Sequence, residues 1–318
     1  MFFNFMSNKL AQNILVTICY YDALNYPLTI FELWKYLING QQIAEIDQKE
    51  NKDSIADIIC ALESKELKNR IENFWGYYFL NGRKDLVFQR LSRNKISEEK
   101  FKIIQRITCF LCWVPFVRMI AVTGRVAMKN AERKSDLDLL IVFEKGHIFL
   151  GRFLSVLLVT ILGKRRKDKK ITNKICLNHF LSTELSVTMQ DLFSAHEYIF
   201  MFPLFGFEWY QNFFKKNEWI KKYHPNFKSD LSMTKEIKDS LRFKLIRRSL
   251  ERLFSFSFFE NSLKKFQVAK IVNNPKTQKI GGIIVYTDDE LAFWPDFEKQ
   301  GPQVFEMYKK RMTKLMSE

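Results

Sequence analysis

The middle of the chain alternates between short apolar runs and a longer apolar segment. The runs at residues 116–124, 136–143 and 174–182 have the length and β-branched content of buried strands. Residues 148–163 are apolar over a length typical of a helix rather than a strand. We therefore predict an α/β (α+β) core with a small mixed sheet over residues 116–187.

Residues 1–85 show a different pattern, with three helical segments followed by two short β-prone runs. The first helix is expected at 8–22, and Thr29 and Glu32 have the spacing of a capping box that starts the second. The third is expected at 54–67, ahead of a β-hairpin. Helices followed by a hairpin are the order of a winged helix, so we predict a winged-helix-like domain here.

The remaining segments are expected to be mainly helical. Residues 86–115 read as a charged helix that links the first domain to the core. From residue 188 to 318 the pattern predicts a helical C-terminal domain with an irregular tail. Within that tail, residues 281–290 could form a hairpin.

The charge of the chain is unevenly distributed. The net charge is +16, yet residues 1–100 hold 13 Lys and Arg against 13 Asp and Glu, so the excess lies in residues 101–318. A basic surface favours phosphate-bearing partners such as nucleotides or nucleic acid, although a solvated lysine-rich surface explains the charge equally well. The basic run at 164–170 is open to the same two interpretations. The even balance of the first domain argues against DNA recognition there.

Cysteine usage and hydropathy indicate a cytoplasmic protein with no membrane partner. The chain has five cysteines without a disulfide-framework spacing, and the C-x-x-C of Cys109 and Cys112 lies in an apolar stretch that predicts buried thiols. The longest uncharged apolar run in the best membrane candidate, Phe153 to Gly163, is shorter than the ~20 residues that span a bilayer. The N-terminus lacks the pattern of a signal peptide.

Two aspartates stand at the start of the second predicted strand. Side chains alternate along a strand, so Asp136 and Asp138 project to one side with their Cα atoms roughly 6.6 Å apart. Carboxylates at this separation can hold one hard cation or straddle two. Burying them unpaired is costly, so a cation or solvent must face them. A strand that begins in solvent would satisfy that requirement too.

Gly124, which ends the preceding strand, makes a metal site the better interpretation. A glycine lets the backbone approach a phosphate, and the start of the next helix offers free N–H groups. A phosphate site beside carboxylates that bind Mg²⁺ is the arrangement that nucleotidyl transfer requires.

The stretch from Gly124 to Asp138 resembles the DNA polymerase β-type nucleotidyltransferase superfamily. Its pattern is an apolar residue, Gly, then Gly or Ser, a short spacer and Asp-apolar-Asp-apolar; the chain as a whole is similar to uncharacterised bacterial nucleotidyltransferase-domain proteins. The resemblance implies transfer of a nucleoside monophosphate from an NTP to a hydroxyl on a small molecule, a protein or an RNA end, with Mg²⁺ or Mn²⁺. It implies metal binding by Asp136 and Asp138, and nucleotide contacts by Gly124, Arg125 and Ser135.

Two positions depart from the family pattern. Arg125 replaces the usual small residue, and could pair with phosphate or block the pocket. The strand expected to carry a third carboxylate offers Asn178, which can bind a metal but cannot act as a base.

Catalysis could then proceed with two carboxylates, or use Glu184 or Glu197. Some antibiotic nucleotidyltransferases take their base from a helical domain, which makes Glu197 a candidate; the alternative for Glu197 is an acid favoured by a helix N-terminus. If activity has been lost, the chain would be a nucleotide- or RNA-binding regulatory protein on the same fold.

Overall fold

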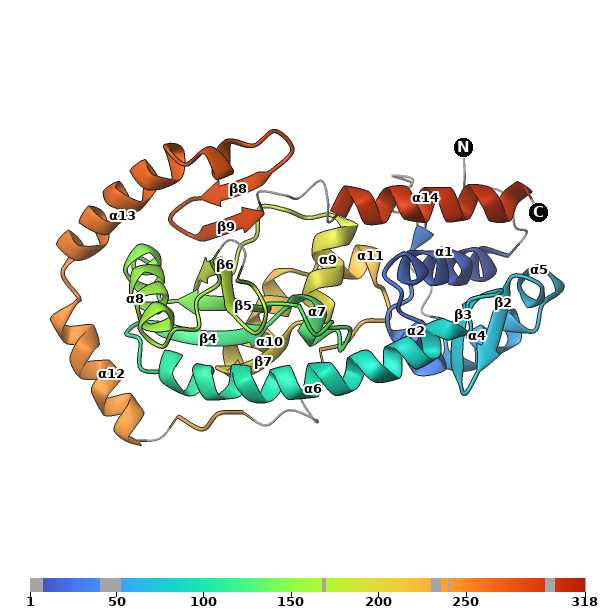
Figure 1. The fold of residues 1–318 in the computed structure, drawn as a ribbon, viewed down its shortest axis with the longest axis horizontal. Helices are drawn as coiled ribbons and strands as arrows, with labels where there is room; N and C mark the ends of the chain where they lie inside the picture. Colours follow the sequence, from blue (N-terminus) through green and yellow to red (C-terminus); the bar gives the residue numbers. More distant parts are fainter. Residues whose placement is uncertain are drawn as a thin grey trace.

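Two β-sheets, one small and one large, organise the chain, and helices surround both (Figure 1). The computed structural model describes residues 8–40, 53–167, 170–229, 236–239, 241–294 and 301–317. The mixed α/β class predicted from the sequence is confirmed.

The large sheet has six strands in a mixed arrangement. Their spatial order is β7 (Phe202–Phe205), β4 (Val117–Val122), β5 (Leu137–Phe143), β6 (Ile175–Ser182), β9 (Glu290–Trp294) and β8 (Ile283–Tyr286). Among the described strand pairs of this sheet, only β5–β6 is parallel. A parallel pair needs a crossover connection, and α8 (Ile148–Ile161) provides it.

The sheet extends past the boundary expected at residue 187. The region 188–318, expected to be helical with an irregular tail, contributes β7, β8 and β9, and it ends in the helix α14 (Gly301–Ser317). The hairpin proposed at 281–290 is confirmed as β8–β9. Strand β7 follows directly on a helix and is only four residues long, so its identity as a strand depends on pairing with β4 rather than on local pattern.

The N-terminal region holds the small antiparallel sheet, with strand order β1-β3-β2. Its elements are α1 (Lys9–Ala23), β1 (Leu28–Thr29), α2 (Ile30–Lys35), α4 (Ile55–Leu62), α5 (Lys65–Lys68), β2 (Ile71–Phe74) and β3 (Tyr77–Leu80). The predicted capping box is confirmed: Thr29 accepts from the Glu32 amide at 3.3 Å and Glu32 accepts from the Thr29 amide at 2.9 Å. The helix predicted at 54–67 is two helices, because Ser64 has an extended backbone conformation.

The two regions are joined by a long helix, α6 (Asp85–Leu111), which starts beside the N-terminal region and runs beneath the large sheet in Figure 1. At the other end of the chain, α14 packs along α1. The buried carboxylate of Asp22 on α1 pairs with Arg83 at 3.1 Å and with Arg311 of α14. The C-terminal helix is thereby fixed to the N-terminal helices, far from it in sequence.

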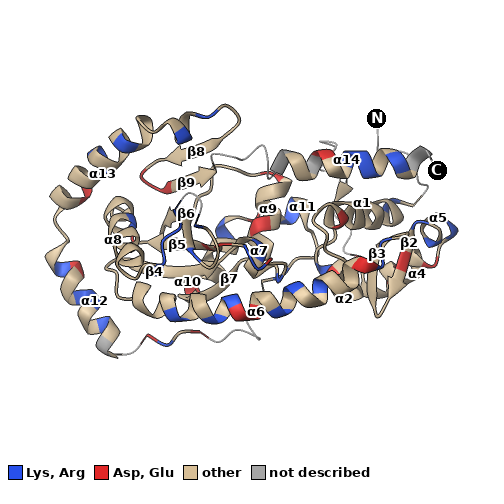
Figure 2. Cartoon of the chain, viewed as in Figure 1, with Lys and Arg blue, Asp and Glu red and all other residues tan. Residues whose placement is uncertain are grey.

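The remaining helices surround the large sheet. They are α7 (Gly124–Ala127), α9 (Leu192–Ile199), α10 (Phe207–Lys216), α11 (Ile220–Tyr223), α12 (Leu241–Leu253), α13 (Ser257–Val272) and the 3₁₀ helix η1 (Pro275–Gln278). Basic residues are frequent on α12, α13 and α14 (Figure 2). Among the described residues, no helix combines the length and apolar character needed to cross a bilayer.

Strand β5 is buried on both faces, and its two faces belong to different apolar clusters. Leu140 and Val142 pack in a cluster with α1, α9 and α14, whereas Leu139 and Ile141 pack in a second cluster with α6 and α8. Because side chains alternate along a strand, Asp138 shares its face with Leu140 and points toward the α9 side. The sequence prediction that both aspartates lie opposite Leu137 and Leu139 is consistent with this arrangement.

Gly206 is required by the close approach of α10 to β4. Its φ is +78°, and a Cβ there would lie 1.9 Å from the carbonyl oxygen of Arg118. We expect Gly206→Ala to lower the free energy of unfolding by about 2 kcal/mol or more, from left-handed strain and the clash. Urea denaturation would measure the loss.

Gly146→Ala is the matched control, because Gly146 has φ +80° and no atom lies within 4 Å of the position that a Cβ would take. Strain alone should lower its unfolding free energy by about 1 kcal/mol. Equal losses in the two variants would contradict the assigned backbone contact.

Candidate functional site

A cavity of about 480 Å³ lies where the start of β5 meets α7, α9 and the N-terminal end of α14. Residues from the α1–β1 connection and from α6 complete its wall, so the N-terminal region takes part in the site. The cavity brings together all seven site residues predicted from the sequence: Gly124, Arg125, Ser135, Asp136, Asp138, Asn178 and Glu197.

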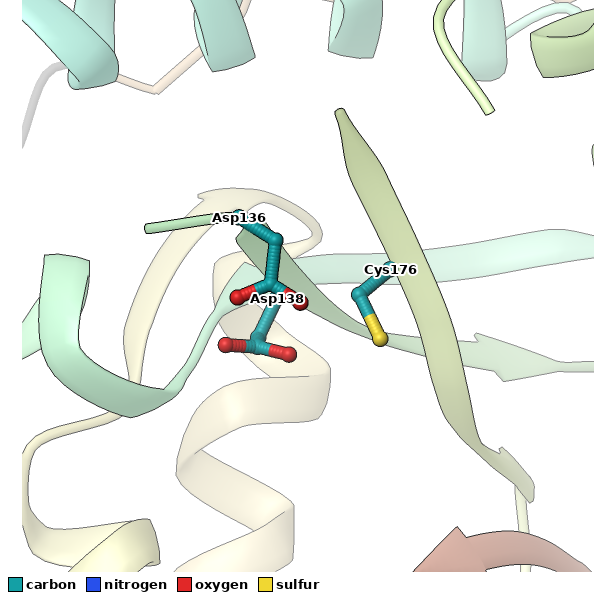
Figure 3. A group of neighbouring side chains, drawn as sticks. All are labelled: Asp136, Asp138 and Cys176. Carbon is teal, nitrogen blue, oxygen red and sulfur yellow. The ribbon is translucent and has the colours of Figure 1, made fainter. Parts of the chain in front are cut away.

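The two aspartates lie side by side at the mouth of β5, and Cys176 of β6 lies next to them (Figure 3). Asp138 and Cys176 are opposite each other in the parallel β5–β6 register. One ligand atom from each of Asp136, Asp138 and Cys176 lies within 4.8 Å of the other two. These three side chains form the candidate metal centre.

Arg166 supplies the positive charge at this centre. One of its guanidinium nitrogens lies 2.5 Å from a carboxylate oxygen of Asp136 and 3.3 Å from the Cys176 sulfur. The backbone amide of Arg166 donates to the carbonyl of Ile175 at 3.0 Å, which holds the loop beside β6. The sequence placed Arg166 only within a basic run, since nothing local distinguishes it from its solvated neighbours. Residues 168 and 169 of that run lie outside the described part of the chain.

Gly124 lies against two acidic side chains, Asp138 and Glu197. Its φ is +64°, and a Cβ there would lie 2.7 Å from a carboxylate oxygen of Asp138. Its backbone N–H donates to the carboxylate of Glu197. Glycine is needed because the Asp138 carboxylate approaches the backbone so closely.

Glu197 reaches the cavity from α9, whose first turn is capped by Asp191 accepting from the Ser194 amide at 2.8 Å. Burial raises the pKa of Glu197 to about 7, against the lowering effects of the Gly124 N–H and Arg125. Burial, with Asp136 and Glu197 nearby, also raises the pKa of Asp138 well above its usual range. Solvent and neighbouring groups therefore do not fully stabilise the negative charge of these carboxylates, and this favours a bound cation.

The other predicted residues lie around the rim. Arg125 pairs with Glu132 at 2.9 Å and its side chain is 61% exposed. Ser135 accepts from the Glu132 amide through its hydroxyl at 2.9 Å, and thereby shapes the turn before Asp136. Asn178 lines the cavity from β6.

Glu184 is not part of this site. It pairs with Lys145 at 2.9 Å beyond the far end of β6, and the described residues that line the cavity do not include it. Of the two alternative acids considered from the sequence, the structure therefore brings only Glu197 to the aspartates.

An apolar wall faces the acidic centre, and the sequence did not identify it. It includes Met189, Phe193, Trp294, Val304 and Met307. These residues come from α9 with its preceding loop, β9 and α14, so no sequence spacing connects them.

His196, beside Glu197 in sequence, packs against the rings of Tyr20 and Tyr21 at centroid distances of 5.4 Å. Burial lowers its pKa to about 3, which leaves the imidazole neutral at physiological pH. Its Nδ1 has no hydrogen-bond partner among the described residues.

Comparison with known proteins gives no assignment for this site. No family model, curated protein or solved structure matches the chain.

The raised pKa of Glu197 makes stability depend on pH. Between the ordinary carboxyl value of 4.5 and about 7, the folded state binds the Glu197 proton more tightly than the unfolded state. Stability therefore falls as pH rises through this window. Glu197→Gln removes the cost of burying a charged carboxylate, and the amide oxygen of the glutamine can still accept from the Gly124 N–H.

We expect Glu197→Gln to gain roughly 1–3 kcal/mol of unfolding free energy over wild type at pH 8, and much less at pH 5. Urea denaturation with a chelator present measures both. Glu184→Gln, at an exposed acid, should show no such gain. A Glu197→Gln difference that is independent of pH would contradict the assigned burial.

Proposed function

We propose that the chain is a Mg²⁺- or Mn²⁺-dependent nucleotidyltransferase that transfers a nucleoside monophosphate from an NTP to a hydroxyl, with loss of pyrophosphate. The observation that carries this proposal is the convergence of Asp136 and Asp138 from β5 and Glu197 from α9 on one cavity. Its volume of about 480 Å³ is within the range of small-molecule sites. The resemblance of residues 116–187 to a nucleotidyltransferase core supports the same activity.

The aspartates fit the proposed cation. Carboxylate oxygens are the ligands that Mg²⁺ and Mn²⁺ prefer, and the local excess of negative charge favours such an ion. When bound, the cation would neutralise phosphate charge and act as a Lewis acid. Asp136 and Asp138 would hold it, and Gly124 keeps Asp138 in place by leaving room for its carboxylate.

Arginines at the cavity would bind the triphosphate. Arg125 is largely exposed, and its pairing with Glu132 leaves other guanidinium N–H groups free to donate to phosphate oxygens. Arg166 lies beside Asp136, where a phosphate bridging to the metal site would be found. The hydroxyl of Ser135 can donate to a phosphate oxygen while it accepts from Glu132.

Glu197 would serve as the general base. A base is most effective when its pKa lies near the working pH, and that of Glu197 is about 7. It would take the proton of the acceptor hydroxyl as that oxygen bonds to the α-phosphorus and pyrophosphate leaves. The hydrogen bond from Gly124 orients the carboxylate for this transfer.

The acceptor is a small molecule, a protein or an RNA end, and the expected location is the cytoplasm. The N-terminal region, with its helices and hairpin, is proposed as a winged-helix-like module. Residues after α1 are part of the cavity wall, so this module would lie beside the acceptor.

A second candidate is a nucleotide- or RNA-binding regulatory protein that has lost catalysis. Two observations favour it: β6 presents Asn178 rather than a carboxylate, and Arg166 already neutralises Asp136. Incubation with labelled NTPs, Mg²⁺ or Mn²⁺ and pools of small molecules, protein and RNA separates the two. NTP binding without pyrophosphate release would favour the regulatory protein.

Asp138→Asn tests the enzyme proposal. Removing one metal-binding carboxylate while keeping side-chain size should reduce nucleotide transfer at least about a hundredfold, because metal stabilisation of the transition state contributes several kcal/mol. Pyrophosphate release and label incorporation provide the measurement. Asp288→Asn is the control, since Asp288 is exposed and pairs with Lys264 in the β8–β9 region. Full activity in Asp138→Asn would refute the assignment.

A further inference from the structure

Cys176 differs from the other buried cysteines in what surrounds it. Among the described residues, Cys19 and Cys112 belong to the two apolar core clusters, and Cys176 belongs to neither. Its sulfur lies within 4.8 Å of a carboxylate oxygen of each of Asp136 and Asp138, and it accepts from Arg166 at 3.3 Å. A thiol used only to fill space would be expected among apolar side chains. This one faces a carboxylate pair.

The register of the sheet fixes that position. Asp138 lies opposite Cys176, and a bulge then shifts the pairing so that Leu140 lies opposite His179. Without the bulge, the register of Leu140 with His179 would put Leu177 opposite Asp138. The residue that accompanies the aspartates is therefore Cys176, while Asn178 lines the cavity farther along β6.

The three ligand atoms are close enough to share one ion. They lie within 4.8 Å of one another, and a tetrahedral site with Zn–S and Zn–O distances near those in proteins places ligand atoms roughly 3.5 Å apart. Side-chain rotation closes a difference of this size. Cys176 and Asp138 come from adjacent paired strands, which keep the ligands in this relation.

The contacts of Arg166 show that Asp136 and Cys176 already face one positively charged group. Its guanidinium contacts an oxygen of Asp136 and the sulfur of Cys176 together. The arginine side chain is 46% exposed, so it can move aside for a metal ion.

A buried polar atom in the same cavity also lacks a partner. Ser194 lies on the same face of α9 as Glu197, and its hydroxyl has no hydrogen-bond partner within the described residues. Such a hydroxyl needs a polar partner that the described residues do not supply.

From this arrangement we infer that Cys176 is a ligand of the cation held by Asp136 and Asp138, and that the centre prefers a thiophilic divalent ion such as Co²⁺ or Zn²⁺ to Mg²⁺. Soft thiolate ligands select these ions, whereas an all-oxygen site suits Mg²⁺. Binding forms a metal–sulfur bond and releases the thiol proton to solvent. The inference deepens the metal site on which the proposed function rests.

Co²⁺ titration of the full chain tests it directly, because thiolate coordination produces a near-ultraviolet charge-transfer band that carboxylates do not. We expect this band in wild type and in Cys60→Ser, a control that removes an exposed cysteine. Cys176→Ser should lose the band and weaken Co²⁺ binding by about tenfold or more. Cys176→Asp should lose the band and bind Mg²⁺ more tightly than wild type.

Arg166→Gln provides a variant that keeps every proposed ligand. It removes the competing guanidinium, so Co²⁺ should bind several times more tightly and the band should remain. Thermal melting establishes that each variant is folded.

Wild-type protein that binds no Co²⁺, or binds it without the sulfur band, overturns the inference without recourse to any variant. A band that survives in folded Cys176→Ser overturns it as well. Nucleotide transfer is assayed separately. A Co²⁺–sulfur band in a protein that transfers no nucleotide with any metal would support Cys176 as a ligand and refute the proposed enzyme. Nucleotide transfer without the band would support the enzyme and refute Cys176 as a ligand.

Discussion

The arrangement of the site depends on one unfavourable interaction, the gathering of several carboxylates in a partly buried cavity. Asp136, Asp138 and Glu197 line one space, and burial raises the pKa of both Asp138 and Glu197. Such charges are costly to bury unless something compensates them. The surrounding contacts all contribute to that compensation. Gly124 donates its amide to Glu197 and leaves room for Asp138, while Arg166 neutralises Asp136. A bound cation would complete it.

The rest of the fold keeps these groups in place. The parallel β5–β6 pair sets Cys176 beside Asp138, and the crossover through α8 returns the chain so that the following loop presents Arg166. Helix α9 covers the face of β5 that carries Asp138, and so brings Glu197 to it. The ion pairs of Asp22 fix α14 to α1, and both ends of the chain thereby contribute to the cavity wall. A site that depends on elements so distant in sequence is sensitive to the stability of the whole fold.

Local pattern predicted the elements of the core well where a strand or helix has a strong signature of its own. The long apolar strand β5 and the capping box of α2 needed no tertiary contact to be recognised. Strand β7 was missed because four residues carry too little pattern, and its pairing with β4 decides its conformation. The helix expected at 54–67 is divided by the conformation of Ser64. Arg166 could not be singled out because a basic run looks the same whether its members are solvated or paired.

The sequence by itself determined which side chains of β5 point together, since strand alternation follows from backbone geometry alone. It also placed Gly124 beside the aspartates through their short separation along the chain. Only the tertiary structure decided which residues meet them. The position of Cys176 opposite Asp138 depends on a register and a bulge, and the choice of Glu197 over Glu184 depends on how α9 packs against the sheet. Pairing and packing are settled by contacts between distant segments, and sequence spacing carries no record of them.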